Sequence, residues 1–225
     1  MVVDSRRQTS LYIIRGTKNQ ELLAPTRRIA RELPLRTGNV KKTVLVIVGM
    51  PGAGKSLASS VMKARGIPVY VSGDIIRAEA RKRKMKFTRE NLGELMLKIR
   101  KEDGMGAVAK RLVPLVEKES GEFVVYEGAR SVEEVDELRR KYGVVVIAIN
   151  ASPQARFRRL QRRGRSDKPR GWADFEERDN RELGVGIAKL IALADRTVEN
   201  EDSKDDLKRR TRRVLQVVLK RKKSS

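Results

Sequence analysis

The chain has 225 residues, of which 39% are apolar and 36% charged, and its formal net charge is +23. A chain of this length is long enough for one large domain with extensions and can bury a sizeable core. It contains no Cys and no His, which excludes disulfides, thiolate metal sites and imidazole bases. Any catalysis must therefore use carboxylates, Lys, Arg, hydroxyls and backbone amides.

The positive charge is concentrated at the two ends of the chain. Residues 1–42 hold ten Lys/Arg against three acids, and residues 203–225 hold ten against two. Basic ends are typical of attraction to RNA or the ribosome, and they are equally typical of solvated faces on a charge-rich protein. We interpret residues 1–42 as a basic N-terminal extension, 43–220 as the main domain and 221–225 as a basic tail.

From residue 43 onward, apolar strand-like runs alternate with helix-like segments. Continuous β-branched runs predict buried strands, at 43–49, 67–73, 122–128, 144–150 and, briefly, within 195–200. Helices are predicted at 55–66, from 74, twice within 88–119, and at 131–143, 152–163, 174–194 and 204–220, with N-caps at Asp74, Thr88, Ser131 and Ser152. The alternation predicts an α/β fold of three layers, in which helices cover a doubly wound, five-stranded parallel sheet.

The most specific motif is GMPGAGKS, residues 49–56, which satisfies the pattern G-x-x-x-x-G-K-[ST]. It follows a predicted buried strand and opens a predicted helix, which is the context that a phosphate-binding loop requires. Its glycines let backbone amides turn inward, and the helix N-terminus adds its positive dipole. Lys55 is expected to reach the β- and γ-phosphates. We therefore predict a P-loop NTPase with the nucleotide-binding residues Gly49, Gly52, Ala53, Gly54, Lys55, Ser56 and Leu57.

A magnesium site is predicted beside this loop. In this motif the hydroxyl of the last residue, Ser56, ligates Mg²⁺. The third strand ends in VVYEG, which places Glu127 where a Walker B acid would follow apolar residues. Glu127 is expected to hold the ion directly or through water, although an ordinary acid at a strand end gives the same pattern.

Three further segments resemble the nucleoside monophosphate kinases. SGDIIRAEA (72–80) looks like their acceptor motif, in which an Arg after a Gly-Asp pair grips the acceptor phosphate. YEGAR (126–130) is similar to their Asp-Gly-x-x-Arg turn, and RLQRRGRSD followed by ERDNRE resembles their arginine-bearing lid. The resemblance implies acceptor binding by Asp74, Arg77 and Arg130, a helical acceptor-binding insertion at about 74–119 and an Arg-rich lid at about 162–174.

More narrowly, residues 43–220 resemble an archaeal family of adenylate-kinase-related P-loop proteins. The segments that carry this resemblance include GMPGAGKS, SGDIIR, NLGEL, EDGMGAVAKR, ERDNREL and IALADRTVEN. The resemblance implies a kinase-like domain related to nucleoside monophosphate kinases and dephospho-coenzyme A kinases. One departure is Glu127, because an Asp is typical at that position and the longer side chain puts the metal contact in question.

The segment LQRRGRSDKPRG (160–171) holds four Arg and one Lys around two glycines. Phosphoryl transfer spreads negative charge over the transferred oxygens, and a kinase answers it with arginines on a lid that closes. A nucleic-acid-binding patch is the alternative for such a stretch. Reading it as a lid, we expect the catalytic residues to be Lys55, Arg162, Arg165, Arg178 and Arg181, with Arg158, Arg159 and Arg163 on the outer helix face.

Together these features predict a kinase of the nucleoside monophosphate kinase type. It would use Mg²⁺ and ATP, with GTP also open as the donor, to phosphorylate a small phosphorylated acceptor. A first alternative is a dephospho-coenzyme A kinase or another hydroxyl-acceptor kinase, in which Asp74 would accept the proton. A second is an RNA- or ribosome-associated P-loop ATPase that uses its basic ends. The longest apolar runs are too short for a bilayer and no secretory signal is evident, so we expect a cytoplasmic protein without membrane contact.

Overall fold

The central feature of the molecule is a five-stranded parallel sheet. The computed structural model describes residues 42–163 and 168–223, apart from the side chains of Arg89 and residues 221–223. Its strand order is β2-β3-β1-β4-β5. The strands are β1 (Thr43–Val48), β2 (Val69–Val71), β3 (Phe123–Glu127), β4 (Gly143–Asn150) and β5 (Arg196–Glu199). The predicted α/β P-loop fold is thereby confirmed, whereas the predicted extension at residues 1–41 lies outside the described residues.

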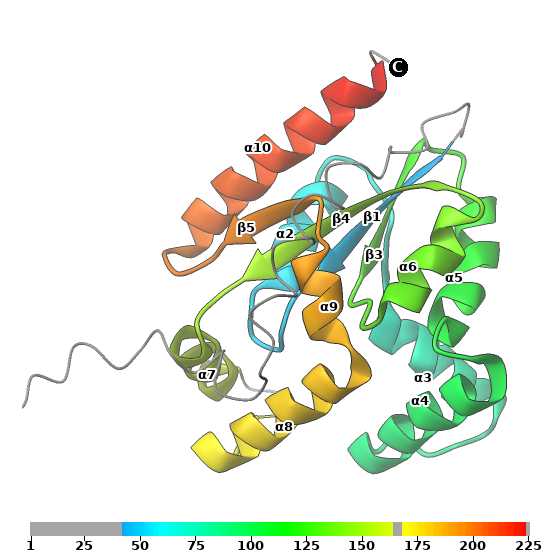
Figure 1. Cartoon of the computed structure of the whole chain (residues 1–225), viewed down its shortest axis with the longest axis vertical. Helices are drawn as coiled ribbons and strands as arrows, with labels where there is room; N and C mark the ends of the chain where they lie inside the picture. The colour runs from blue at the N-terminus through cyan, green and yellow to red at the C-terminus, as the bar shows by residue number, and fades with distance from the viewer. Residues whose placement is uncertain (1–41, 164–167, 224–225) are drawn as a thin grey trace, which may run out of the picture. The chain divides into compact units, whose positions relative to one another are not determined.

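Helices cover both faces of this sheet, as Figure 1 shows. On one face, side chains of α3 (Ser72–Lys82), α4 (Arg89–Asp103), α5 (Ala107–Lys118), α6 (Val132–Arg139) and α9 (Ile187–Ala192) join the core. On the other face, α2 (Lys55–Lys63) and α10 (Lys204–Lys223) do so. The remaining helices, α7 (Pro153–Arg162) and α8 (Trp172–Val185), lie beyond the carboxyl end of β4 (Figure 1).

The position of β1 at the centre of the sheet explains why its sequence is a continuous apolar run. Val44, Val46 and Val48 pack into the core on one face, and Leu45 and Ile47 pack into the core on the other. All five are fully buried. A strand covered on both faces has no solvent side, so it shows no alternation of apolar and polar residues.

Several predicted helix starts are confirmed by their caps, and one is wrong. The hydroxyls of Thr88, Ser131 and Ser152 accept hydrogen bonds from backbone amides three residues later, at 3.1, 3.4 and 3.3 Å. Helix α3 begins at Ser72, so β2 is shorter than expected and Asp74 lies inside the first turn rather than at the N-cap. An acid there still favours the helix because it faces the positive end of the helix dipole.

The chain's last helix is longer than expected. Helix α10 continues to Lys223, past the predicted boundary at residue 220, so most of the predicted basic tail is helical. Leu207, Leu215 and Val218 dock this helix on the core through their buried side chains. In the part of the chain that the structure describes, no helix combines the length and apolarity needed to cross a membrane.

Candidate functional site

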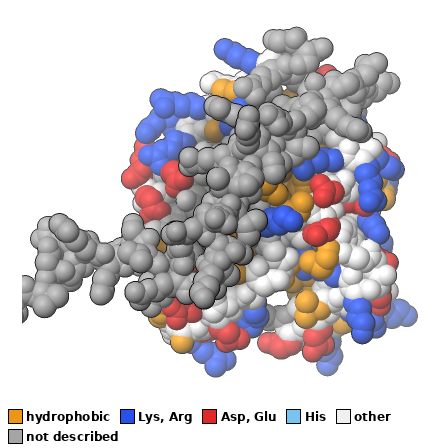
Figure 2. Space-filling model, viewed as in Figure 1, with side chains coloured by type: hydrophobic (Ala, Val, Ile, Leu, Met, Phe, Trp, Pro, Cys, Tyr) orange, Lys and Arg blue, Asp and Glu red, His pale blue; other side chains and the backbone are white. Residues whose placement is uncertain are grey.

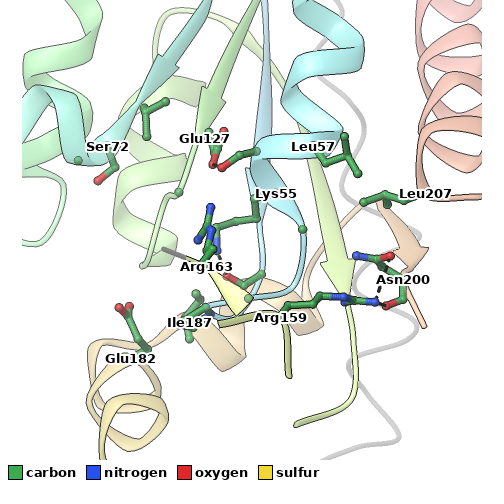
Figure 3. Close-up of a pocket in the computed structure, with 18 of the residues that line it drawn as sticks. Lys55, Leu57, Ser72, Glu127, Arg159, Arg163, Glu182, Ile187, Asn200 and Leu207 are labelled. Carbon is green, nitrogen blue, oxygen red and sulfur yellow. Dashed lines mark hydrogen bonds between the residues drawn. The ribbon is translucent and has the colours of Figure 1, made fainter. Parts of the chain in front are cut away.

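A cavity of about 840 Å³ lies at the carboxyl edge of the sheet. Its walls come from the loop between β1 and α2, the start of α3, the turn after β3, the end of α7, helix α8 and the turn between β5 and α10. Figure 3 shows Lys55, Arg163 and Glu182 around this space, although they come from three different segments. Parallel strands bring such segments together because their carboxyl ends meet at one edge.

The loop between β1 and α2 has a backbone that only glycine adopts readily. Gly52 and Gly54 have φ angles of 80° and 106°. A Cβ at Gly52 would lie 2.8 Å from the Arg156 carbonyl oxygen, and one at Gly54 would lie 2.4 Å from the Asn200 amide nitrogen. Helix α2 starts directly after Gly54 without a side-chain cap or an acid in its first turn. Its first amides are therefore available for an anion.

Lys55 closes over this loop from inside the cavity. Its ammonium donates to the carbonyl oxygens of Gly49 at 2.6 Å and Met50 at 3.1 Å. Burial lowers the pKa of Lys55 to about 8, the carboxylate of Glu182 opposes the shift, and the guanidinium of Arg130 adds to it. A buried ammonium held only by carbonyl oxygens lacks a full counter-charge, so this position favours an anionic ligand.

Ser56 and Glu127 place two oxygen ligands next to the loop. The Ser56 hydroxyl donates to Glu127 Oε1 at 2.7 Å. Glu127 ends β3 and is paired in register with Ile47 of β1 and Val71 of β2, which fixes it at the carboxyl edge of the sheet. Hydroxyl and carboxylate oxygens suit Mg²⁺, which commonly keeps several waters and binds through substrate phosphates. Among the described residues no cluster of three acidic, His or Cys side chains could hold a metal alone.

Arg130 lies across the cavity and is held by a carboxylate of α8. Its Nε donates to Glu182 Oε2 at 2.7 Å and its Nη2 to Glu182 Oε1 at 3.4 Å. The pKa of Glu182 is lowered because the nearby Arg130 outweighs its burial, which alone would raise it. The guanidinium also approaches the Ser72 hydroxyl at 3.5 Å. This fork-to-fork pair links the turn after β3 to α8.

A buried network behind Arg130 fixes its backbone. The fully buried Glu134 accepts hydrogen bonds from Arg100 Nη2 at 2.9 Å, the Tyr126 hydroxyl at 2.5 Å and the Arg130 amide at 3.3 Å. Burial raises the pKa of Tyr126 well above its usual value, and the Glu134 carboxylate adds to the shift. The capping pair between Ser131 and Glu134 is therefore only half of a capping box, because the carboxylate of Glu134 serves this network instead.

Arg156 joins the phosphate-loop segment to α8. Its guanidinium forms a bidentate pair with Asp179 at 2.9 and 2.5 Å and donates to the Pro51 carbonyl oxygen at 3.2 Å. It also lies 4.9 Å from the centre of the Phe175 ring. Both charged side chains are nearly buried, with 5% and 13% exposure. The pair therefore holds α7, α8 and the loop in one arrangement.

The structure brings most of the predicted site residues to the cavity. Those that line it are Gly49, Gly52, Gly54, Lys55, Ser56, Leu57, Arg77, Glu127, Arg130, Arg162 and Arg178. Ala53 does not line the cavity. It is buried, and its carbonyl oxygen accepts a hydrogen bond from the side-chain amide of Asn200 at 2.7 Å. Arg165 lies outside the described residues.

Two predicted residues lie away from the cavity. Arg181 is exposed and pairs with Glu177 at 3.2 Å, three residues along α8 from Arg178 but not among the lining residues. Asp74 is also exposed and pairs with Arg77, which alone of the two reaches the cavity. Because α8 has only one face toward the cavity, an i, i+3 spacing did not suffice to bring both of its arginines there.

The lining residues that sequence reasoning missed include Arg159, Arg163, Glu182 and Asn200. The assignment of Arg159 and Arg163 to the outer face of α7 is wrong. Arg159 donates to the Asn200 carbonyl oxygen at 2.7 Å, as Figure 3 shows, and Arg163 follows it by four residues. The buried Leu160 between them indicates the inner face of α7 and was the available signal.

Comparisons with known proteins agree with this arrangement. The family model described as AAA domain matches residues 48–176. A UPF0200 protein of Hyperthermus butylicus is 41% identical over 174 residues, which are 77% of this chain and 94% of that protein. UPF0200 protein PF1294 of Pyrococcus furiosus is 45% identical over 181 residues, 78% of this chain and 97% of that protein.

Among solved structures, the fold is similar to that of shikimate kinase from Bacteroides thetaiotaomicron. The two share a TM-score of 0.57 and 14% sequence identity, over 78% of this chain and 98% of that chain. At this identity the likeness concerns the fold alone.

Proposed function

Because this chain belongs to the UPF0200 family of P-loop proteins, we propose that it is a phosphotransferase. In this proposal it binds ATP with Mg²⁺ and transfers the γ-phosphoryl group to an acceptor that carries a phosphate. An acceptor phosphate oxygen attacks the γ-phosphorus, the bond to the β,γ-bridging oxygen breaks, and ADP leaves. Such an acceptor is already ionised at neutral pH, so the reaction needs no His.

The observation that supports this proposal is the number of cations in one cavity beside a phosphate loop. Six arginines line it together with Lys55 and Lys204: Arg77, Arg130, Arg159, Arg162, Arg163 and Arg178. The triphosphate of the donor occupies the loop, Lys55 and the start of α2. Arginines on α3 and after β3 are left for a second phosphate-bearing molecule. Charge stabilisation by preorganised donors is the main contribution to catalysis of phosphoryl transfer.

Mg²⁺ has a defined place in this proposal. The oxygens of Ser56 and Glu127 would hold it, with the nucleotide phosphates and water completing its ligands. The ion would neutralise charge on the β- and γ-phosphates. An Asp is typical at the position of Glu127, and Glu has the longer side chain. Glu127 is nevertheless buried, fixed by strand pairing and in contact with the Ser56 hydroxyl.

An acceptor phosphate at Arg130 would compete with Glu182. The pair at 2.7 Å occupies the guanidinium donors that a phosphate would take. Arrival of the acceptor would release α8 from this contact, which couples acceptor binding to the helix that follows the predicted lid. The proposed catalytic arginines are Arg162, Arg163 and Arg178, because each lines the cavity from that side.

The hydroxyl-acceptor alternative, such as a dephospho-coenzyme A kinase, finds less support. Its general base would be Asp74, but this side chain is 64% exposed, pairs with Arg77 and is not among the residues that line the cavity. A base must lie within hydrogen-bond reach of the proton it removes. The RNA-associated ATPase rests on the chain's basic ends. Of these ends, the structure describes Lys42 and residues 203–223.

A panel of acceptors tests the proposal. With ATP or GTP and Mg²⁺ present, we expect one acceptor that carries a phosphate, either a nucleoside monophosphate or a strand with a terminal phosphate, to yield a phosphorylated product in equal amount with the diphosphate formed from the donor. Dephospho-coenzyme A, RNA and a sample without acceptor form the other arms. Arg130→Ala should raise the KM for the acceptor and lower kcat, whereas Arg139→Ala should change neither, because Arg139 lies on the surface of α6. Nucleotide hydrolysis that needs no acceptor and rises with RNA would instead establish the ATPase.

The lowered pKa of Lys55 predicts that nucleotide affinity falls above about pH 8. The free protein loses the Lys55 proton near that pH, whereas bound phosphates favour the charged form and keep it. The Kd of an ADP analogue should therefore rise up to about tenfold per pH unit above this point. Fluorescence titration across this range measures it, with Lys63→Ala as the matched control at the other end of α2. A Kd that stays flat through about pH 9.5 would remove Lys55 from phosphate binding.

A further inference from the structure

A concentrated run of positive charge among the described residues lies at the end of α3 and in the segment that follows it. Residues 74–89 hold seven Lys/Arg against two acids. Arg81, Lys82, Lys84, Lys86 and Phe87 are all exposed; they are named here the basic strip. Elsewhere, on the face seen in Figure 2, Lys and Arg side chains are intermixed with Asp and Glu. An unmixed cluster of cations is a site for a polyanion.

The basic strip begins where the cavity ends. Arg77 lines the cavity, and Arg81 follows one turn later on the same side of α3, about 6 Å along the helix axis. The strip then leaves the helix after Lys82. A ligand whose phosphate meets Arg77 therefore reaches the strip with its next charged group.

The cations of the strip are not consumed by internal pairs. Arg83 lies between Lys82 and Lys84 in the sequence and does not belong to the strip. It is bound to Glu79 at 2.9 Å and to Glu102 at 3.1 Å, and it stabilises the packing of α3 on α4. Lys82, Lys84 and Lys86, by contrast, form no ion pair with any described residue. Exposed lysines without counter-charges bind phosphates without first breaking an ion pair.

An exposed aromatic ring lies among these cations. Phe87 is 50% exposed, and the guanidinium of Arg81 lies 5.6 Å from its ring centre. The exposed half of this side chain gains nothing from the hydrophobic effect unless a ligand covers it. Unpaired bases stack on such rings, and cations beside the ring bind the backbone that carries the bases.

We propose that the basic strip binds a single-stranded nucleic acid whose terminal phosphate enters the cavity at Arg77. This inference deepens the proposed function, on which it rests for the meaning of the cavity, because it names the class of acceptor. A mononucleotide would fill only the cavity and would not touch the strip. A duplex has no unpaired base to stack on Phe87, so a single strand is the form that fits.

Fluorescence anisotropy with the full chain tests the proposal without any phosphoryl transfer. The probe is a labelled single strand of about ten nucleotides, a length in the range of small single-strand sites. It is used with a 5′-phosphate, with a 3′-phosphate and without either. We expect the wild type to bind one of the two phosphorylated forms more tightly than the unphosphorylated strand and more tightly than a duplex. Arg77→Ala should abolish the preference for the phosphorylated end.

Charge-matched variants locate the site. Arg81→Ala/Lys86→Ala should weaken binding of the strand about tenfold or more and lower the slope of log K against log salt by about 0.7 for each phosphate that is no longer neutralised. Arg212→Ala/Arg213→Ala removes two exposed cations from α10 and should change affinity less than about twofold if the strip is the site. Phe87→Ala should weaken binding about tenfold, whereas Phe87→Tyr keeps a ring and should retain it.

Three results would overturn the proposal. Equal losses of affinity in the two charge variants would mean unspecific attraction, and a larger loss from α10 would place the site on that helix. If the wild type did not bind a single strand more tightly than a duplex, the strip would not be a site for single-stranded nucleic acid. Binding of an ADP analogue by Arg81→Ala/Lys86→Ala and by Phe87→Ala is expected to be unchanged. If no acceptor in the panel is phosphorylated while strand binding behaves as expected, the proposed phosphotransferase function is wrong. The proposed strand-binding site is then still supported.

Discussion

Lys55→Ala is expected to abolish phosphoryl transfer while the fold survives. The ammonium of Lys55 lies at the phosphate loop and is held by the carbonyl oxygens of Gly49 and Met50. Nucleotide phosphates would replace these two weak partners with a full counter-charge. Loss of one such donor in a buried site costs at least about a hundredfold in kcat, and the affinity for ATP falls with it.

The stability of the same variant separates a lost function from a lost fold. Because burial lowers the pKa of Lys55 to about 8, the folded protein binds fewer protons than the unfolded chain between there and 10.5. The free energy of unfolding that Lys55 controls therefore rises with pH in that window, and the charged side chain costs stability at pH 7. Lys55→Ala should have a Tm at pH 7 equal to or above that of the wild type.

The control for this prediction lies on the same helix. Lys63 is in the last turn of α2 and is exposed. Lys63→Ala should leave transfer unchanged. If Lys55→Ala kept near-wild-type transfer, the loop between β1 and α2 would not be the phosphate site, even though the fold is that of a P-loop protein.

The fold could be predicted from sequence because its signals are local. The run Thr43–Val48 is buried on both faces, and the motif after it dictates a turn that only glycines adopt. Parallel order then follows from the alternation of strands and helices. The predicted archaeal P-loop family is confirmed as UPF0200. Local boundaries failed at Asp74, where α3 begins two residues earlier than its cap pattern indicated. The helix predicted at 174–194 is divided into α8 and α9 at Gly186.

The cavity could be predicted only in part because its far wall depends on helix rotation. A helix presents one face inward, and Arg159, Arg163 and Glu182 reach the cavity through that rotation alone. The ion pair between Arg130 and Glu182 could not be predicted either, because the two residues are 52 positions apart in the sequence. No sequence pattern pairs residues over that distance. In contrast, Ser56 and Glu127 could be placed together, because both follow strands whose carboxyl ends meet.

Arg156→Ala is expected to cost about 3–5 kcal/mol of unfolding free energy, the usual loss when one partner of a buried ion pair is removed. Asp179 would remain almost buried without its counter-charge, and the Pro51 carbonyl oxygen would lose its donor. In a domain of this size the change corresponds to a Tm lower by roughly 10 °C. Thermal unfolding measures it. Nucleotide affinity should fall as well, because the Arg156 side chain would no longer hold Pro51 of the phosphate loop.

A double-mutant cycle identifies the cause of that loss. Arg156→Ala/Asp179→Ala should be more stable than the sum of the single losses implies, because the second change removes the unpaired carboxylate. Arg156→Lys should recover only part of the stability, since an ammonium cannot form the bidentate pair. Arg139→Ala breaks a solvent-exposed pair with Asp136 and should cost less than about 1 kcal/mol. If Arg156→Ala proved as mild as Arg139→Ala, the pair with Asp179 would not hold α8 against the loop, and the coupling between the two sides of the cavity would need another carrier.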